Sequence, residues 1–137
     1  MANSARKPKL PQGKLQHQCY TEHKTRRVTT WIDETPGEQL GITSRIESCD
    51  HGVWDFNIML RSWHGLQGRV MVFVRYCACH ANYHRHLWRW AAPETEGRRS
   101  YGVLDTLTDL RHAHRHATMS IESDPLEVRE QWLNGTL

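Results

Sequence analysis

The 137-residue sequence has no apolar run approaching the ~20 residues that a membrane-spanning helix requires. Its first residues, MANSARKPKLPQGK, are charged and lack the apolar core of a secretory signal peptide. We therefore expect a soluble protein that is neither secreted nor bound to a membrane. In a reducing compartment its four cysteines, Cys19, Cys49, Cys77 and Cys79, are expected to be thiols rather than disulfides.

The sequence also lacks the motifs of several common catalytic sites. It has no Gly-rich phosphate loop, no His-Glu-x-x-His and no nucleophile elbow. His116-x-Thr118 resembles half of the paired His-x-Thr signature of two-histidine phosphoesterases. We expect no enzymatic activity and no catalytic residues. A phosphoesterase is kept as a third hypothesis, which would require both histidines and a measurable turnover.

Charge and length bound the class of protein. Lys and Arg exceed Asp and Glu by 18 to 15, and ten histidines can become charged near a polyanion. This mild basic bias permits nucleic-acid binding without requiring it. The length and the 38% hydrophobic content indicate one modest core, and we predict a single α+β domain, an antiparallel sheet backed by a few short helices. Residues 1–16 are predicted to be a mobile basic arm, and residues 17–137 the domain.

Alternation of apolar and polar residues predicts a hairpin in the middle of the chain. Residues 53–63 alternate with Phe56 and Ile58 on the apolar face, and HGLQG follows as a connection of hairpin length. Residues 69–79 are the predicted partner strand. One face would carry Val70, Val72, Val74 and Tyr76, and the other Arg69, Met71, Phe73, Arg75, Cys77 and Cys79. The periodicity of residues 18–33 does not choose between strand and helix.

Three further elements are predicted towards the C-terminus. Residues 81–92 place Tyr83, Leu87 and Trp90 at helical spacing, and Pro93 would end that helix. Residues 107–121 alternate, with arginines and alanines on one face and His112, His114 and His116 on the other, as in a strand. Residues 123–135 form a C-terminal helix with Asp124 as N-cap, Pro125 at the first position, Glu127 completing a capping box and Gly135 after the last turn.

The stretch from Val74 to Trp90 is dense in cysteine and histidine, which raises the question of a metal site. Structural zinc commonly takes a pair of cysteines two to four residues apart together with a second, distant pair. Cys77-x-Cys79 is one residue too tight, and His80 with His84 or Cys49 with His51 does not complete a pair of pairs. We expect no metal ligands and no cofactor. A zinc-stabilised nucleic-acid-binding regulatory protein remains the second hypothesis.

A sheet face with arginines and small hydroxyl or imidazole groups can bond the phosphates and 2′-hydroxyls of an RNA duplex without reading its sequence. The sequence offers this chemistry at Arg69, Arg75, Arg111, the histidines of 112–116, Thr118 and Ser120. The alternative is that these side chains form the solvated face of an antiparallel sheet.

The order of segments bears on this choice. SWHGLQGRVMVFVRY followed by YHRHLWRW resembles the pattern Ser-Trp-Gly, Gly-basic-Val-Val-Phe, Arg-Tyr, then Leu-His-Arg and Trp of the small RNA-silencing suppressors of tombusviruses and aureusviruses. TMSIESDPLEVREQWL is similar to the final strand, Ser-containing turn and C-terminal helix of that family. The resemblance spans about residues 61–133, and the shared letters are scattered.

The resemblance implies a homodimeric viral protein of the host cytoplasm whose concave sheet sequesters double-stranded small interfering RNA. The RNA-binding residues would be Arg61, Arg69, Arg75, Arg115, Thr118 and Ser120. Tombusvirus members stack two tryptophans on the duplex ends, whereas this neighbourhood offers only Trp31, so longer duplexes should bind too. Trp132 would lie at the dimer interface, or simply pack the C-terminal helix. Host silencing proteins are a second class of expected partner.

Overall fold

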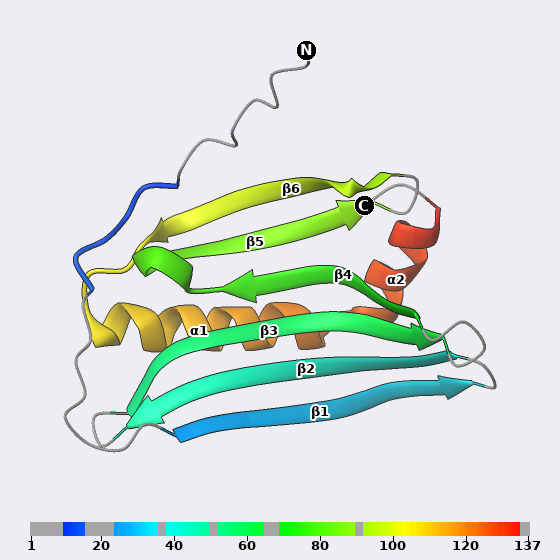
Figure 1. The fold of residues 1–137 in the computed structure, drawn as a ribbon, viewed down its shortest axis with the longest axis horizontal. Coiled ribbons are helices and arrows are strands. Elements are labelled where there is room, and N and C mark those ends of the chain that lie inside the picture. The colour runs from blue at the N-terminus through cyan, green and yellow to red at the C-terminus, as the bar shows by residue number, and fades with distance from the viewer. Residues whose placement is uncertain are drawn as a thin grey trace, which may run out of the picture.

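The computed structural model describes residues 10–15, 24–35, 38–49, 52–64, 69–89 and 92–134. It contains a six-stranded antiparallel sheet and two helices, which confirms the predicted α+β class (Figure 1). The strands are β1 (Lys24–Thr35), β2 (Glu38–Cys49), β3 (Gly52–His64), β4 (Arg69–Cys77), β5 (Asn82–Arg89) and β6 (Ala92–Val103). A short turn of 3₁₀-helix, η1 (Cys79–Ala81), precedes β5, and the helices are α1 (Leu107–Ser123) and α2 (Pro125–Leu133).

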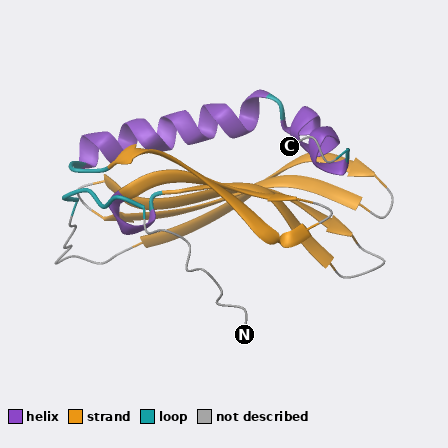
Figure 2. Ribbon diagram, turned by 90° about the horizontal axis from the view of Figure 1, so that it is seen from above, coloured by secondary structure: helices purple, strands orange, loops and turns teal. Residues whose placement is uncertain are grey.

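The sheet is a meander in which each strand pairs with the next along the chain. Both helices lie on the same side of this twisted sheet (Figure 2). The opposite side, which we call the open face, carries neither α1 nor α2. Neither described helix is long and apolar enough to cross a membrane.

The predicted strands at residues 53–63 and 69–79 are confirmed as β3 and β4, although β4 ends at Cys77. In the segment of residues 18–33, for which the periodicity left strand and helix open, the described residues 24–33 belong to strand β1. The predicted helix at 81–92 is wrong, because residues 82–89 form β5. Tyr83 and Leu87 are four residues apart, and that spacing puts two side chains on one face of a strand as well as of a helix. Pro93 ends no helix. It lies in the edge strand β6, where a missing N–H is tolerated.

The predicted strand at 107–121 is also wrong, because these residues form α1. Its buried side chains are Leu110, Ala113, Ala117 and Ile121, which follow a helical period that the alternation of histidines obscured. The start of α1 has a capping box between Thr106 and Asp109. The Asp109 carboxylate accepts hydrogen bonds from backbone N–H groups, and these lower its pKa. The C-terminal helix is confirmed, with the Asp124 carboxylate accepting from the Glu127 N–H at 3.3 Å.

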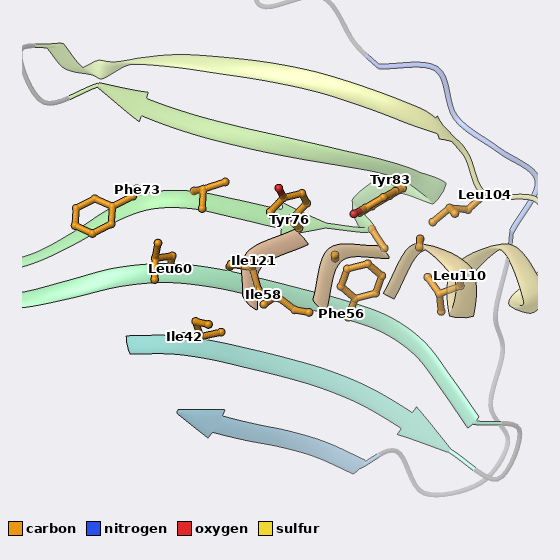
Figure 3. Packing of buried hydrophobic residues seen from close by; sticks show 14 of the residues in the cluster. Ile42, Phe56, Ile58, Leu60, Phe73, Tyr76, Tyr83, Leu104, Leu110 and Ile121 are labelled. Atoms are coloured by element: carbon orange, nitrogen blue, oxygen red, sulfur yellow. The ribbon is translucent and has the colours of Figure 1, made fainter. Parts of the chain in front are cut away.

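The core lies between the sheet and α1 (Figure 3). Phe56 of β3 is fully buried, and its ring packs against Tyr83 and against the edge of His114, with centroids 6.0 and 5.1 Å away. Burial lowers the pKa of the His114 imidazole. Of the three histidines that were predicted to share a strand face, His114 therefore packs against the core, whereas His112 and His116 are exposed. The His116 ring meets the Tyr83 hydroxyl at 2.7 Å.

An irregularity in β4 changes which residues share a face. The register between β3 and β4 shifts between Leu60 and Arg61, so Phe73 and Val74 are both buried in the core. Phe73 packs against Trp132 of α2 with ring centroids 4.4 Å apart. The prediction that Phe73 and Arg75 share a face is therefore wrong, because a single alternation cannot run through a bulge.

Residues 10–15 lie along the end of the sheet near η1. The Gly13 N–H donates to the Ala81 carbonyl at 2.9 Å, and the Leu15 N–H donates to the Leu104 carbonyl at 3.0 Å. A Cβ atom on Gly13 would lie 2.0 Å from that Leu104 oxygen, so only glycine fits there. Residues 1–9 and 16 of the predicted basic arm lie outside the described residues.

Cys49, at the end of β2, is disulfide-bonded, whereas Cys77 and Cys79 are free thiols. The expectation of reduced thiols is wrong for Cys49, because it rested on a compartment and not on which cysteines lie within bonding reach. Cys19 lies outside the described residues.

Candidate nucleic-acid interface

Two rows of polar side chains cross the open face on all six strands. Strand register aligns the residues of each row across neighbouring strands. Along β3 the row residues Asn57 and Met59 alternate with Phe56, Ile58 and Leu60, which are buried in the core. Because successive side chains of a strand point to opposite faces, both rows lie on the side opposite α1 and α2. The first row is Arg27, Arg45, Asn57, Cys77, His84 and Ser100. The second row is Thr29, Thr43, Met59, Arg75, His86 and Arg98.

Arg61 and Arg75 are the central cations of this face. Arg61 lies 4.3 Å above the Trp63 ring, and Arg75 lies 5.3 Å from the centroid of Trp88. Both Nε atoms are buried and have no hydrogen-bond partner within the described part of the chain. Burial lowers the pKa of Arg61, but a guanidinium stays charged at any physiological pH. The two tryptophans hold the flat guanidinium groups in place without neutralising them.

The described ion pairs of the open face involve Arg45 instead. Its guanidinium lies 2.7 Å from Glu47 and 3.7 Å from Asp55. Burial raises the pKa of the Asp55 carboxyl, an effect that Arg45 opposes. No carboxylate of the described residues is paired with Arg61 or Arg75. Arg61 and Arg75 therefore place positive charge on the central strands β3 and β4 that no described carboxylate compensates.

The second row places two arginines on either side of a histidine. Arg75 on β4 and Arg98 on β6 flank His86 on β5 in register. Two cations on the same face, one strand apart, raise the local positive potential, which favours a bound polyanion. Burial lowers the pKa of His84 in the neighbouring row, and Arg75 and Arg98 lower it further. The His84 ring adds hydrogen-bonding capacity in its neutral form.

Trp31 on the edge strand β1 packs against Trp63 on β3, and the two rings form an aromatic surface on the open face. Their ring centroids are 4.9 Å apart, and Trp31 is 43% exposed. Gly41 lies beneath the pair, because a Cβ atom there would come within 3.2 Å of both rings. Exposed tryptophans next to cationic groups can stack on nucleotide bases. Trp31 was predicted from the sequence, whereas its partner Trp63 was not.

The structure separates the predicted RNA-binding residues into two groups. Arg61 and Arg75 share the open face, on neighbouring strands and two residue pairs apart. Arg115, Thr118 and Ser120 lie on α1, which covers the other face, so they do not join Arg61 and Arg75. The Thr118 hydroxyl donates to the His114 carbonyl within its own helix. Arg69 pairs with His64 in the ladder, and its side chain lies outside the described part.

The residues that sequence reasoning missed are Arg27, Arg98, His84 and His86. In the strand β5, side chains alternate between the two faces of the sheet. Tyr83, Arg85 and Leu87 therefore share the core side, and His84, His86 and Trp88 share the open face. The helical interpretation of this segment hid that signal. Trp90 lies outside the described residues.

The second His-x-Thr needed for a phosphoesterase exists in the sequence as residues 23–25. His23 lies outside the described residues, and the Thr25 hydroxyl donates to Glu47 at 2.7 Å on β2. Thr25 lies on the edge strand β1, whereas Thr118 lies on α1. The two threonines therefore belong to different layers of the fold.

No protein-family model, curated protein sequence or solved structure matched this chain significantly in our comparisons. The chemistry of the open face and the resemblance of scattered residues are therefore what indicates a function.

Proposed function

We propose that this protein binds double-stranded RNA on its open face through contacts to the sugar–phosphate backbone and thereby suppresses RNA silencing. The observation that carries the proposal is the pair Arg61 and Arg75, two guanidinium groups held over tryptophan rings with no paired carboxylate among the described residues. Guanidinium groups recognise phosphate oxygens by parallel hydrogen bonds, which carry no sequence information.

The arrangement favours a duplex over a single strand. The cations are spread over several strands of a broad sheet, and a wide, shallow RNA minor groove exposes its phosphates and hydroxyls to such a surface. Thr29, Thr43 and Ser100 line up with the arginines in the two rows and supply hydroxyl groups for 2′-hydroxyl contacts. Trp31 and Trp63 lie at one side of the rows, where they would stack on a terminal base pair.

The biological role, the homodimer and the action in host cytoplasm rest on the resemblance to viral suppressors. A protein that covers the backbone of a short duplex keeps that duplex from other RNA-binding proteins, and sequence-independent contacts let it do so for any sequence. Binding to host silencing proteins would be a separate activity.

The test compares two charge-matched double variants. R61Q/R75Q removes two cations from the open face, and R26Q/R115Q removes two exposed cations from β1 and α1 that do not belong to the rows. Each protein is titrated against a short RNA duplex in gel-shift assays at one salt concentration. We expect R61Q/R75Q to bind about tenfold or more weakly and R26Q/R115Q to bind like the wild type. Equal losses in both variants would contradict binding at the open face.

The same variants test the biological part of the proposal. In leaf tissue that silences a reporter gene, the wild type and R26Q/R115Q should restore the reporter, and R61Q/R75Q should not. Restoration by R61Q/R75Q despite lost duplex binding would separate suppression from RNA sequestration.

A further inference from the structure

The two rows bring three metal-binding side chains together beside the arginines. Cys77 on β4 is aligned with His84 on β5, and His86 lies two residues farther along the same side of β5. All three residues are buried. One ligand atom from each, the thiol sulfur and an imidazole nitrogen from each histidine, lies within 4.8 Å of the other two. Sheet register thus assembles a cluster that the spacing of cysteines in the sequence did not indicate.

The hydrogen bonds of His84 set its orientation. Nδ1 lies 2.9 Å from the carbonyl oxygen of Asn82, and a carbonyl only accepts, so Nδ1 carries the proton. Nε2 then presents its lone pair to the Cys77 sulfur, 3.1 Å away. A metal-binding histidine typically has this arrangement, in which the ring nitrogen that does not bind the metal donates to a backbone carbonyl. We propose that Cys77, His84 and His86 form a Zn²⁺ site with three protein ligands.

The distances permit such a site after small side-chain adjustments. Zinc bonds of about 2.0–2.3 Å in tetrahedral geometry place ligand atoms about 3.3–3.6 Å apart. The Cys77 sulfur and His84 Nε2, 3.1 Å apart, would move slightly apart, and the His86 ring would approach them by side-chain rotation. Histidine and cysteine are the ligands that zinc prefers among protein side chains.

The fourth coordination position would face a cavity of about 610 Å³ that Asp55, Cys79 and His80 also line. Arg75 and Arg98 line the same cavity, which makes it electropositive. Replacement of the Cys77 proton by Zn²⁺ adds one net positive charge to the cavity, and this charge together with the arginines favours a water-derived hydroxide or another anion at the fourth position. The site would also tie β4 to β5 at the centre of the open face.

The first test uses the full chain after treatment with a chelator. Zn²⁺ is titrated in competition with a chromophoric indicator into the wild type, C77S and C79S. Cys79 is the matched control, because it is a free, exposed thiol two residues away that lines the same cavity. We expect the wild type and C79S to bind one equivalent of zinc. Loss of a residue that only supports a metal ligand lowers zinc affinity by about 10–100-fold, and the zinc affinity of C77S should fall by more than this.

The second test begins with the wild-type protein, so its main result does not depend on the folding of a variant. Co²⁺ replaces zinc in the wild-type protein, and its absorption spectrum is recorded. A sulfur-to-cobalt charge-transfer band with tetrahedral d–d bands would support coordination by Cys77 and histidines, and the band should persist in C79S. Absence of stoichiometric metal binding by the folded wild type, or loss of the band in C79S instead of C77S, would overturn the assignment. The inference is independent of RNA binding, because duplex binding is measured separately on chelator-treated protein.

Discussion

Replacement of Arg75 by alanine should reduce the salt dependence of duplex binding by a definite amount. Arg75 occupies the central part of the second row, next to Met59 on β3 and His86 on β5. Its guanidinium lies against the Trp88 ring and has no paired carboxylate among the described residues. If it contacts one phosphate, its removal keeps about one counterion on the nucleic acid.

The magnitude follows from counterion release. Each phosphate contact contributes about 0.9 to the slope of log K against log salt concentration for a duplex. Between 50 and 200 mM salt, a fourfold change, one contact is worth about 3.5-fold in affinity. The ratio of wild-type to Arg75→Ala affinity should therefore shrink by about 3.5-fold across this range, and by about 12-fold for the double variant with Arg61→Ala.

The assay is a fluorescence anisotropy titration of two RNA duplexes of unrelated sequence at four salt concentrations. The slope should fall by about one unit for Arg75→Ala, equally for both duplexes. Arg26→Ala is the control, because Arg26 is exposed on β1 and does not belong to the rows. An unchanged slope for Arg75→Ala, or a loss confined to one duplex sequence, would refute backbone contact by this residue.

Three predictions concern the fold. Phe56→Ala removes a fully buried ring from the core and should lower the free energy of unfolding by about 3–5 kcal/mol, measured by urea titration. Phe56→Leu should lower it by clearly less. Similar small losses for both variants would contradict the assigned packing. Burial lowers the pKa of His114, so the unfolded chain binds a proton at this residue more readily than the folded one. The free energy of unfolding should therefore decrease as pH falls below the ordinary histidine pKa of about 6.5, by up to about 1.4 kcal/mol per pH unit. His114→Gln should flatten this part of the curve of unfolding free energy against pH, and an unchanged curve would show that His114 is not the group responsible. Ala81 has φ of 54°, so Ala81→Gly should raise the melting temperature, by relief of about 1 kcal/mol of backbone strain; a lower melting temperature would argue against that conformation.

In each element that the sequence predicts correctly, all the local signals indicate the same type of secondary structure. In β3 the apolar residues alternate without interruption, and α2 has an N-cap, a proline at its first position and a helical run. The two wrong elements have ambiguous signals. Tyr83 and Leu87 in β5, like Ala113 and Ala117 in α1, are four residues apart, which suits either structure. In α1 the capping box of Thr106 and Asp109 was the local signal that distinguishes them.

The candidate site depends on information that a single strand pattern does not contain. Arg61 and Arg75 were both selected from the sequence, but their neighbourhood follows from pairing between strands and from the bulge at Phe73. The cluster of Cys77, His84 and His86 likewise arises from register between β4 and β5. Pairing of Trp31 with Trp63 spans three strands and is possible because Gly41 between them has no side chain. Such relationships are tertiary, and local periodicity does not encode them.

The central claim is that the open face recognises double-stranded RNA by shape and charge. The most direct measurement is a competition experiment in which chelator-treated protein holds a labelled RNA duplex. Unlabelled competitors are the same duplex, an RNA duplex of unrelated sequence, a DNA duplex and single-stranded RNA. We expect both RNA duplexes to displace the label with equal potency, and the DNA duplex and single-stranded RNA to do so far more weakly. Equal displacement by single-stranded RNA or by DNA, or displacement by only one of the two RNA sequences, would contradict this claim.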